Sequence, residues 1–164
     1  MNFVIDETYI NWDLFTELFS YNKTHERIRE FVKAIDPEIK VFMSGEDFYC
    51  YTDTKEINVP FVSNPEGDRL ICDFIYDRFG VVMDPYLVGC LHEVGHLMTY
   101  DEQIDKERSI IYYMLQLNFE EEKWEEYSKM YFSIPCEFEA TKWAVEYYLS
   151  HKEFCDNFIK EISL

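Results

Sequence analysis

The stretch Asp84-Pro85-Tyr86-Leu87-Val88-Gly89-Cys90-Leu91-His92-Glu93-Val94-Gly95-His96-Leu97-Met98 is the part of the chain around which we expect the fold to form. Asp84 is a good N-cap for a helix, and Pro85 suits the first helical position. Apolar residues recur at helical spacing and should form the face opposite the histidines: Leu87, Leu91, Gly95 and Met98. Gly95 lowers helix propensity by about 1 kcal/mol relative to Ala, which indicates close approach of another backbone. The stretch therefore predicts a central helix.

The two histidines of this stretch could bind one metal ion together. His92 and His96 lie four residues apart, so on a helix both imidazoles project from one face. Glu93 lies one step round the helix from His92, where its carboxylate can address a water on the ion. Two histidine ligands with a neighbouring general base are typical of zinc hydrolases. The alternative is that both histidines only make hydrogen bonds on a buried helix.

Length and composition indicate a single folded domain, residues 1–164. Apolar residues make up 48% and aromatic residues 18% of the chain, which is typical of a globular protein rather than a disordered one. The longest uncharged run, Ser109 to Phe119, is too short to span a bilayer. The N-terminal residues carry no basic segment of the kind found in signal peptides. We therefore expect no membrane association and a cytoplasmic location.

The cysteine spacing predicts the state of the thiols, and the net charge excludes one class of binding partner. The five cysteines show no Cys-x-x-Cys spacing and are predicted to be reduced thiols that are neither bridged nor metal ligands: Cys50, Cys72, Cys90, Cys136 and Cys155. Cys136 should point about 100° away from its helical neighbour, Glu137. The net charge of −18 argues against direct nucleic-acid binding, because phosphates would be repelled. It leaves open a basic protein partner or a surface that mimics DNA.

The N-terminal third predicts two helices followed by a small sheet. One helix is expected from Thr8 to Phe19, and a second from a cap at Asn22 or Thr24 to the residue before Pro37. Three short segments rich in β-branched and aromatic residues then predict strands: Ile39–Met43, Phe48–Thr52 and Glu56–Val62. Residues 53–55 should form a hairpin loop between the last two strands. Pro60 lacks an N–H and marks the third strand as an edge, or as ending there.

The remainder of the chain is predicted to be helical. A turn at Asn64–Gly67 and a cap at Asp68 should open a helix that closes at Gly80. Four more helical segments follow the histidine helix: Ile104–Leu117, the acidic run Glu120–Glu126, a helix opened by Pro135, and Lys152–Ile162. The predicted fold class is therefore α+β, with a small N-terminal antiparallel sheet and a mostly helical remainder.

A catalytic zinc site with two histidines needs one more protein ligand, which leaves the fourth position for water. We rank Glu137 first, because a proline opens its helix and because Ala140 and Ala144 would let that helix pack closely on another. Glu139 lies two residues further on and should face away. The alternative is that both are ordinary surface acids of an acidic protein.

His92-Glu93-Val94-Gly95-His96 followed by Glu137-Phe138-Glu139-Ala140 resembles the gluzincin pattern, in which HExxH is completed by a Glu on a later helix. The small size and the Glu-x-Glu-Ala…Ala string resemble minimal gluzincins of the ImmA/IrrE type, found in phages and mobile elements. The resemblance covers the two motif helices. It implies a zincin-like fold, a Zn²⁺ cofactor, His92, His96 and Glu137 as ligands, and Glu93 as the base. One turn after the third ligand these families often carry Asp or Asn, which orients a ligand histidine; here Thr141 stands instead.

The function expected from these features is zinc-dependent hydrolysis of peptide bonds. The first hypothesis is a narrow-specificity endopeptidase acting on a protein regulator, in which Glu93 takes the proton of the attacking water. The oxyanion stabiliser could be His151 or any of thirteen tyrosines. The alternative is a non-catalytic binding or inhibitor protein that uses an acidic surface on a zincin scaffold. The presence of Glu93 favours the enzyme, because a purely structural site does not need that base.

A substrate peptide is expected to bind extended along an exposed strand, as in the zincins that this chain resembles. The predicted docking edge is Glu56–Val59, the part of the third strand before Pro60, running past His92 and Glu93. The alternative is an edge strand blunted by Pro60 and Glu56 only to prevent aggregation.

Overall fold

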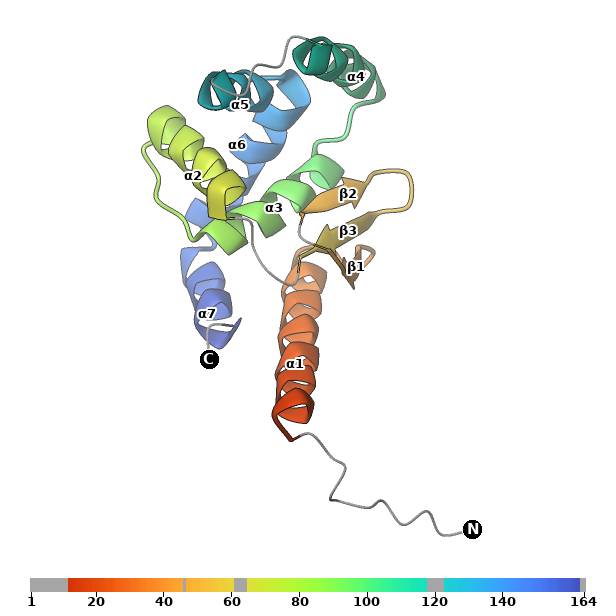
Figure 1. Ribbon diagram of the computed structural model, residues 1–164, viewed down its shortest axis with the longest axis vertical. Helices are drawn as coiled ribbons and strands as arrows, with labels where there is room; N and C mark the ends of the chain where they lie inside the picture. Colours follow the sequence, from red (N-terminus) through yellow and green to blue (C-terminus); the bar gives the residue numbers. More distant parts are fainter. Residues whose placement is uncertain (1–11, 46, 61–64, 118–122, 163–164) are drawn as a thin grey trace.

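The computed structural model describes residues 12–45, 47–60, 65–117 and 123–162. This part of the chain folds into a small sheet at one side of a helical body (Figure 1). The elements follow in the order α1 (Trp12–Ile35), β1 (Lys40–Met43), β2 (Tyr49–Tyr51), β3 (Glu56–Val59), α2 (Pro65–Phe79), α3 (Pro85–Met98), α4 (Glu102–Leu117), α5 (Trp124–Phe132), α6 (Pro135–Ser150) and α7 (Lys152–Ile162). The α+β class with a mostly helical remainder is confirmed. Within the described ranges, no helix has the length and apolar character needed to cross a bilayer.

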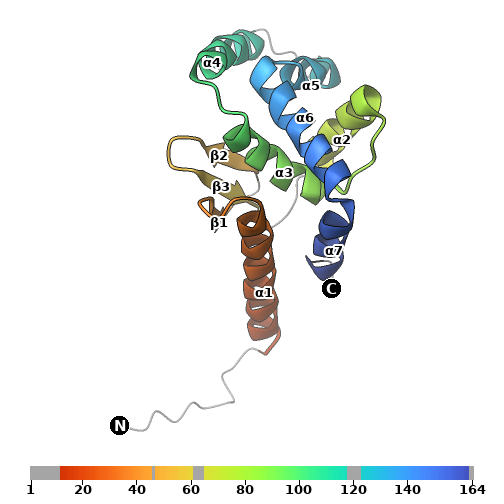
Figure 2. The ribbon, with the colours of Figure 1, turned by 180° about the vertical axis from the view of Figure 1, so that it is seen from behind.

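The predicted histidine helix is α3, and it occupies the centre of the molecule. Its N-cap is Asp84, whose side chain accepts hydrogen bonds from the backbone N–H of Tyr86 at 3.0 Å and of Leu87 at 3.2 Å. Every residue from Leu87 to His96 is buried. The sheet lies on one side of α3, and α2 and α6 lie on the other (Figures 1 and 2). The expectation that Met98 belongs to the apolar face is wrong, because it is 45% exposed where the helix leaves the core.

The close backbone approach expected at Gly95 is confirmed. A Cβ placed on Gly95 would lie 2.4 Å from the carbonyl oxygen of Ala140 in α6, closer than any real contact of that kind. Ala140 and Ala144 are both fully buried, so α6 presents small side chains to its neighbours, as expected. The missing side chain of Gly95 therefore lets α6 approach α3 closely at the level of His96, and this packing positions the candidate site.

The sheet is mixed, so the predicted antiparallel sheet is wrong in one pairing. β2 pairs antiparallel with β3 through the predicted hairpin, but β1 pairs parallel with β3, in the order β1-β3-β2. The β1–β2 connection is held by Asn58, whose side-chain amide donates to the carbonyl oxygens of Ser44 at 2.7 Å and Asp47 at 2.9 Å. The apolar pattern identifies which segments are strands but not which strands pair. The connection from β1 to β2 crosses β3, and the buried Asn58 of β3 holds it through these two hydrogen bonds.

The strand order also makes the predicted docking edge wrong. β3, Glu56–Val59, is the central strand and pairs on both sides, so no peptide can add to it. Pro60 acts as predicted in one respect, since β3 ends at Val59, but it terminates a central strand rather than marking an edge. Among the described strands, β2 is the edge strand that packs against α3.

Two helix boundaries differ from the sequence-based expectation. A single helix, α1, covers Trp12–Ile35, because that stretch contains no proline or glycine that would separate two helices; residues 8–11 of the first predicted helix lie outside the described part. Helix α2 begins at Pro65, so residues 65–67 form its first turn rather than the predicted turn, and Asp68 is not its cap. Asn64 and residues 120–122 of the acidic run also lie outside the described part, whereas Glu125 and Glu126 are exposed on α5.

The first and last helices pack together through aromatic rings. Phe31 of α1 stacks on Phe158 of α7, with ring centroids 4.0 Å apart, and on Phe154 at 5.0 Å. Phe31 and Phe158 are buried, and Phe154 is 40% exposed at the margin. The amphipathic C-terminal helix predicted at Lys152–Ile162 thus holds α1 in place beneath the sheet (Figure 1).

Candidate metal centre

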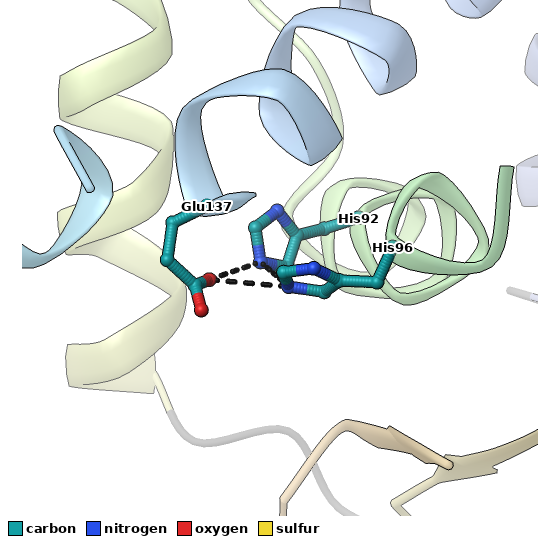
Figure 3. Close-up of side chains that lie close together, drawn as sticks. All are labelled: His92, His96 and Glu137. Carbon is teal, nitrogen blue, oxygen red and sulfur yellow. Dashed lines mark hydrogen bonds and ion pairs between the residues drawn. The ribbon is translucent and has the colours of Figure 1, made fainter. Parts of the chain in front are cut away.

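Three side chains from two helices meet at one point in the interior (Figure 3). The Nε2 atoms of His92 and His96 lie 3.1 Å apart, and each lies 3.1 Å from Oε2 of Glu137. All three residues are buried, and Glu137 has no exposed surface. The structure therefore brings together the residues predicted as ligands, and among the described residues this group could hold a metal ion.

The neighbouring acid, Glu139, is not part of this group. Its carboxylate lies 3.6 Å from Nζ of Lys142, and its side chain is 45% exposed. The choice of Glu137 over Glu139 as the residue that approaches the histidines agrees with the structure. The cause is the helical geometry expected from the sequence, which places Glu139 about 200° round α6 from Glu137.

Thr141 fixes the orientation of His92. Its hydroxyl donates to the carbonyl oxygen of Glu137 at 2.8 Å, which leaves an oxygen lone pair facing Nδ1 of His92 at 3.1 Å. We therefore assign the proton of His92 to Nδ1 and the free lone pair to Nε2, which points at the other two donor atoms. The resemblance to the gluzincin pattern predicted Asp or Asn at this position, and in this chain the hydroxyl of Thr141 contacts the histidine.

The donor atoms form a set that suits a cation. With the proton of His92 on Nδ1, its Nε2 is a hydrogen-bond acceptor, as is Oε2 of Glu137. A single N–H on Nε2 of His96 can be directed at only one of these two acceptors, so the other is left without a donor within the group. Burial alone would raise the pKa of Glu137, but imidazoles of His92 and His96 that carry charge and donate from Nε2 outweigh it and hold the pKa well below its ordinary value. When Nε2 of His92 is free, a cation between the three atoms would take the place of those protons. Glu137 is thus ionised at neutral pH. Ligand atoms around a tetrahedral ion at about 2.0–2.1 Å would lie about 3.3 Å apart, close to the observed spacing.

No family model, curated protein or solved structure matched the chain in the comparisons with known proteins.

Glu93, the predicted general base, directly follows His92 on α3. Its side chain is buried, with 8% of its surface exposed, and its carboxylate has no hydrogen-bond partner in the described part of the chain. The carboxylate oxygens are not among the fully buried polar atoms that lack a partner in the described part, so they reach the surface and can meet water. Its position next to a potential ligand is the one a proton acceptor would need.

The thiol of Cys136 contacts the site, which the sequence did not predict. Its Sγ donates to Oε1 of Glu137 at 3.9 Å, on the carboxylate oxygen that does not face the histidines. Cys136 and Glu137 are neighbours on α6, as expected, and the long carboxylate side chain reaches back to the thiol. No sulfur belongs to the candidate ligand group found among the described residues, and all five cysteines are free thiols.

A cavity of about 170 Å³ adjoins the metal centre. His96 lines one side of it, Tyr51 of β2 and Asp53 line another, and Tyr100 and Asp101 of the α3–α4 connection close it. Of the thirteen tyrosines considered as oxyanion stabilisers, the cavity places Tyr51 and Tyr100 near the centre. The edge strand β2 therefore meets the metal centre at this cavity.

His151 is too far from the centre to stabilise an oxyanion there. It caps the C-terminal end of α6, where its Nδ1 lies 3.1 Å from the carbonyl oxygen of Tyr147 and its ring stacks on that tyrosine. Glu137 lies at the opposite end of the same helix, about 20 Å away at 1.5 Å per residue. Sequence distance alone could have excluded His151 once both residues were assigned to one helix.

We expect Thr141→Val to weaken metal binding about 10- to 100-fold, because valine keeps the volume but removes the hydrogen-bond partner of His92. Competition with a chelating dye would measure the affinity. Thr141→Ser, which keeps the hydroxyl, is the matched control and should bind metal nearly as well as the original protein. Equal affinities of the valine and serine variants would show that Thr141 does not orient the histidine.

The five thiols should differ in reactivity. Burial raises the pKa of Cys90 to about 12 and that of Cys155 to about 11. At pH 8 the reactive thiolate of Cys90 would be only about 10⁻⁴ of the total. A disulfide reagent should therefore label Cys50, Cys72 and Cys136 first, and the two buried thiols only after unfolding. Rapid labelling of Cys90 in the folded protein, or loss of metal in Cys136→Ser, would contradict the assignment of these thiols.

Proposed function

We propose that this protein is a zinc-dependent peptidase in which His92, His96 and Glu137 hold the metal and Glu93 acts as general base. The observation that carries the proposal is the convergence of two imidazole nitrogens and one carboxylate oxygen at mutual distances of 3.1 Å in a buried site. Two His and one Glu, with a fourth position left for water, form a donor set that catalytic zinc sites use. The spacing of the motif and its resemblance to minimal gluzincins support the same reading.

Different residues of the chain would have different roles in hydrolysis. A divalent metal, when bound here, supplies Lewis acidity that polarises a carbonyl group and acidifies water. Glu93 would accept the proton of the attacking water and pass it to the leaving amine, because its carboxylate has no other partner in the described part of the chain. Thr141 would hold His92 in the tautomer that keeps Nε2 free.

The edge of β2 is the place where a substrate would lie. Among the described strands, Tyr49–Tyr51 pairs with β3 and lies at the edge of the sheet, and its last residue lines the cavity next to His96. An extended peptide can add to such an edge through main-chain hydrogen bonds, while pockets select its side chains. A protein segment is therefore a better candidate substrate than a small molecule, and we retain a protein regulator as the first hypothesis.

The strong negative charge is the observation that favours the second candidate function. A net charge of −18 would suit a protein that binds a basic partner without cleaving it. Glu93 lies beside a potential metal ligand, and its carboxylate has no hydrogen-bond partner in the described part of the chain. A protein that only binds its partner does not require a carboxylate in that position. The two functions differ in one measurable property, the hydrolysis of a bound peptide.

Removal and return of the metal test the proposal. The purified protein should contain about one zinc per chain and should cleave members of an unbiased peptide library. A chelator should abolish cleavage, and added zinc should restore it. A protein that takes up no stoichiometric metal would refute the proposal, whereas stoichiometric zinc without cleavage would favour the binding protein.

A further inference from the structure

We propose that β2 selects substrate segments that carry aromatic or β-branched side chains at two positions spaced two residues apart, and that Tyr49 and Tyr51 make this selection. This inference rests on the proposed peptidase function and specifies its substrate class. The observation that carries it is an exposed pair of aromatic rings on the edge strand that reaches the cavity beside His96.

The register of the sheet divides its side chains between two faces. Cys50 lies opposite Ile57, and Ile57 lies opposite Val41. Ile57 and Val41 are buried in the hydrophobic core, and Cys50 packs against it. Because successive side chains of a strand point to opposite faces, Tyr49 and Tyr51 project from the other face, which we call the outer face.

The outer face is aromatic and open to solvent. Tyr49 is 40% exposed and Tyr51 is 54% exposed, and their rings meet edge to face with centroids 5.4 Å apart. Phe42 of β1 lies on the same face, across Asn58, and is 51% exposed. Exposed apolar side chains that adjoin one another, unlike those scattered singly, are typical of interaction sites.

The polar side chains of the outer face are already paired within the sheet. The amide of Asn58 donates to the carbonyl oxygens of Ser44 and Asp47, and its oxygen accepts from the hydroxyl of Ser44 at 2.7 Å. Nζ of Lys40 lies 3.0 Å from Oε1 of Glu56. The outer face therefore offers a substrate aromatic rings rather than an unpaired charge, so its selectivity should be for apolar side chains.

An extended chain is the partner that fits this strand. Among the described strands, β2 lies at the edge, and in an antiparallel pair every second residue turns its N–H and C=O away from the partner strand. An extended segment can bind those backbone groups by adding to the edge. β2 has only 3 residues, so main-chain hydrogen bonds alone would hold a segment weakly. Cross-strand side-chain pairs would then supply much of the selectivity.

A second copy of this chain is a poorer occupant of the edge. Each chain carries a net charge of −18, so two copies repel each other. A peptide segment without that charge can approach the edge, and a substrate segment is therefore the expected occupant.

The spacing of the selected positions follows from the pleat of the strands. Side chains of an added segment that lie opposite Tyr49 and Tyr51 share the outer face, and they are two residues apart. The residue between them lies opposite Cys50 and points to the side of α3, where the cavity and His96 lie. The selected pair therefore flanks the substrate residue that faces the metal centre.

The experiment uses short extended peptides that carry two valines spaced one, two or three residues apart. Each is matched by a peptide with threonines at the same positions, because threonine has the shape and strand preference of valine but is polar. Binding is measured to the Glu93→Gln protein, so that no peptide is cleaved. We expect valine to strengthen binding about threefold to tenfold over threonine at a spacing of two. The preference should be smaller at the other spacings, because only one of the two side chains can then lie on the outer face.

Variants of the outer face locate this preference. Tyr49→Thr and Tyr51→Thr keep a residue that favours strands but remove a ring, and each should reduce the valine preference about twofold to fivefold. Tyr51→Phe keeps the ring and should retain the preference. Phe42→Thr is the matched control, because β1 lies two strand spacings, about 10 Å, from β2 on the side away from the added segment. It should leave the preference unchanged.

Three results would overturn the proposal. The first is a valine preference that does not depend on the spacing, which is measured on the Glu93→Gln protein itself and so applies even where a tyrosine variant does not fold. The second is a preference that survives both tyrosine substitutions or falls equally in Phe42→Thr. The third is self-association of the original protein, detected by sedimentation and removed by Tyr51→Thr, which would assign the edge to a second copy.

Failure of the peptidase function would be seen separately. Cleavage by the metal-loaded original protein without a preference for spaced apolar side chains would leave the peptidase intact and refute the role of the outer face. A spacing-dependent valine preference in binding without any cleavage would support the outer face and refute the peptidase.

Discussion

Glu137→Ala is expected to abolish stable metal binding. The carboxylate is fully buried and its Oε2 lies 3.1 Å from both histidine nitrogens, so its loss removes one of three candidate ligands. The affinity should fall by more than the 10- to 100-fold typical of losing a hydrogen-bond partner of a ligand. Metal content after dialysis against a mild chelator, measured by mass spectrometry, would record the loss.

Glu139→Ala is the matched control for this variant. It changes the same charge on the same helix, but its carboxylate lies outside the candidate ligand group. It should keep its metal under the same dialysis. Glu137→Gln, which preserves the volume of the buried side chain, guards against general misfolding and should also lose affinity. Metal retained in Glu137→Ala and lost in Glu139→Ala would mean that the ligand has been assigned to the wrong acid.

Glu93→Gln is expected to lower kcat about 10²- to 10⁴-fold while the protein keeps its metal. Glutamine has nearly the shape of glutamate but cannot accept the proton of the attacking water. Since Glu93 has no hydrogen-bond partner in the described part of the chain, the change should disturb the fold little. Cleavage rates of the best library peptide, measured at saturating concentration, would report the effect.

Metal content must be measured on the same Glu93→Gln sample. A variant that loses both metal and activity would show that Glu93 supports the site structurally rather than acting as a base. Unchanged cleavage with full metal content would remove Glu93 from the mechanism. Glu146→Gln is a suitable control, because it replaces an exposed glutamate at the far end of α6.

The candidate site was predictable because its residues follow from local rules. A four-residue spacing on a helix determines that His92 and His96 share a face. The small residues after Glu137 indicated that a second helix could approach, and Gly95 indicated where. The structure joins these two observations in one contact, between Gly95 and the backbone of Ala140. The residues alone did not show that these two helices pack on each other. Only the resemblance to the gluzincin pattern indicated that they do.

The sheet was harder to predict because strand pairing depends on contacts between distant residues. The three strands and the hairpin between β2 and β3 were identifiable from composition and turn residues. The parallel pairing of β1 with β3 depends on a connection that Asn58 holds, and a single asparagine in a strand gives no such signal. Placing β3 at the edge followed from reading Pro60 alone, although a proline that ends a strand is equally compatible with a central one.

The two motif helices are far apart in the chain, and this has a consequence for how the protein holds together. His96 and Glu137 are separated by 41 residues, and α4 and α5 lie between them. An ion bound to both would act as a cross-link, and closing a loop of that length restricts the unfolded chain by about 4 kcal/mol in the chain-entropy account used for disulfides. Binding energy at the ion would also be folding energy. Metal-free protein should therefore be digested faster by proteases, and first between α3 and α6. The residues proposed to hold the metal for peptide cleavage would then also protect this chain from cleavage.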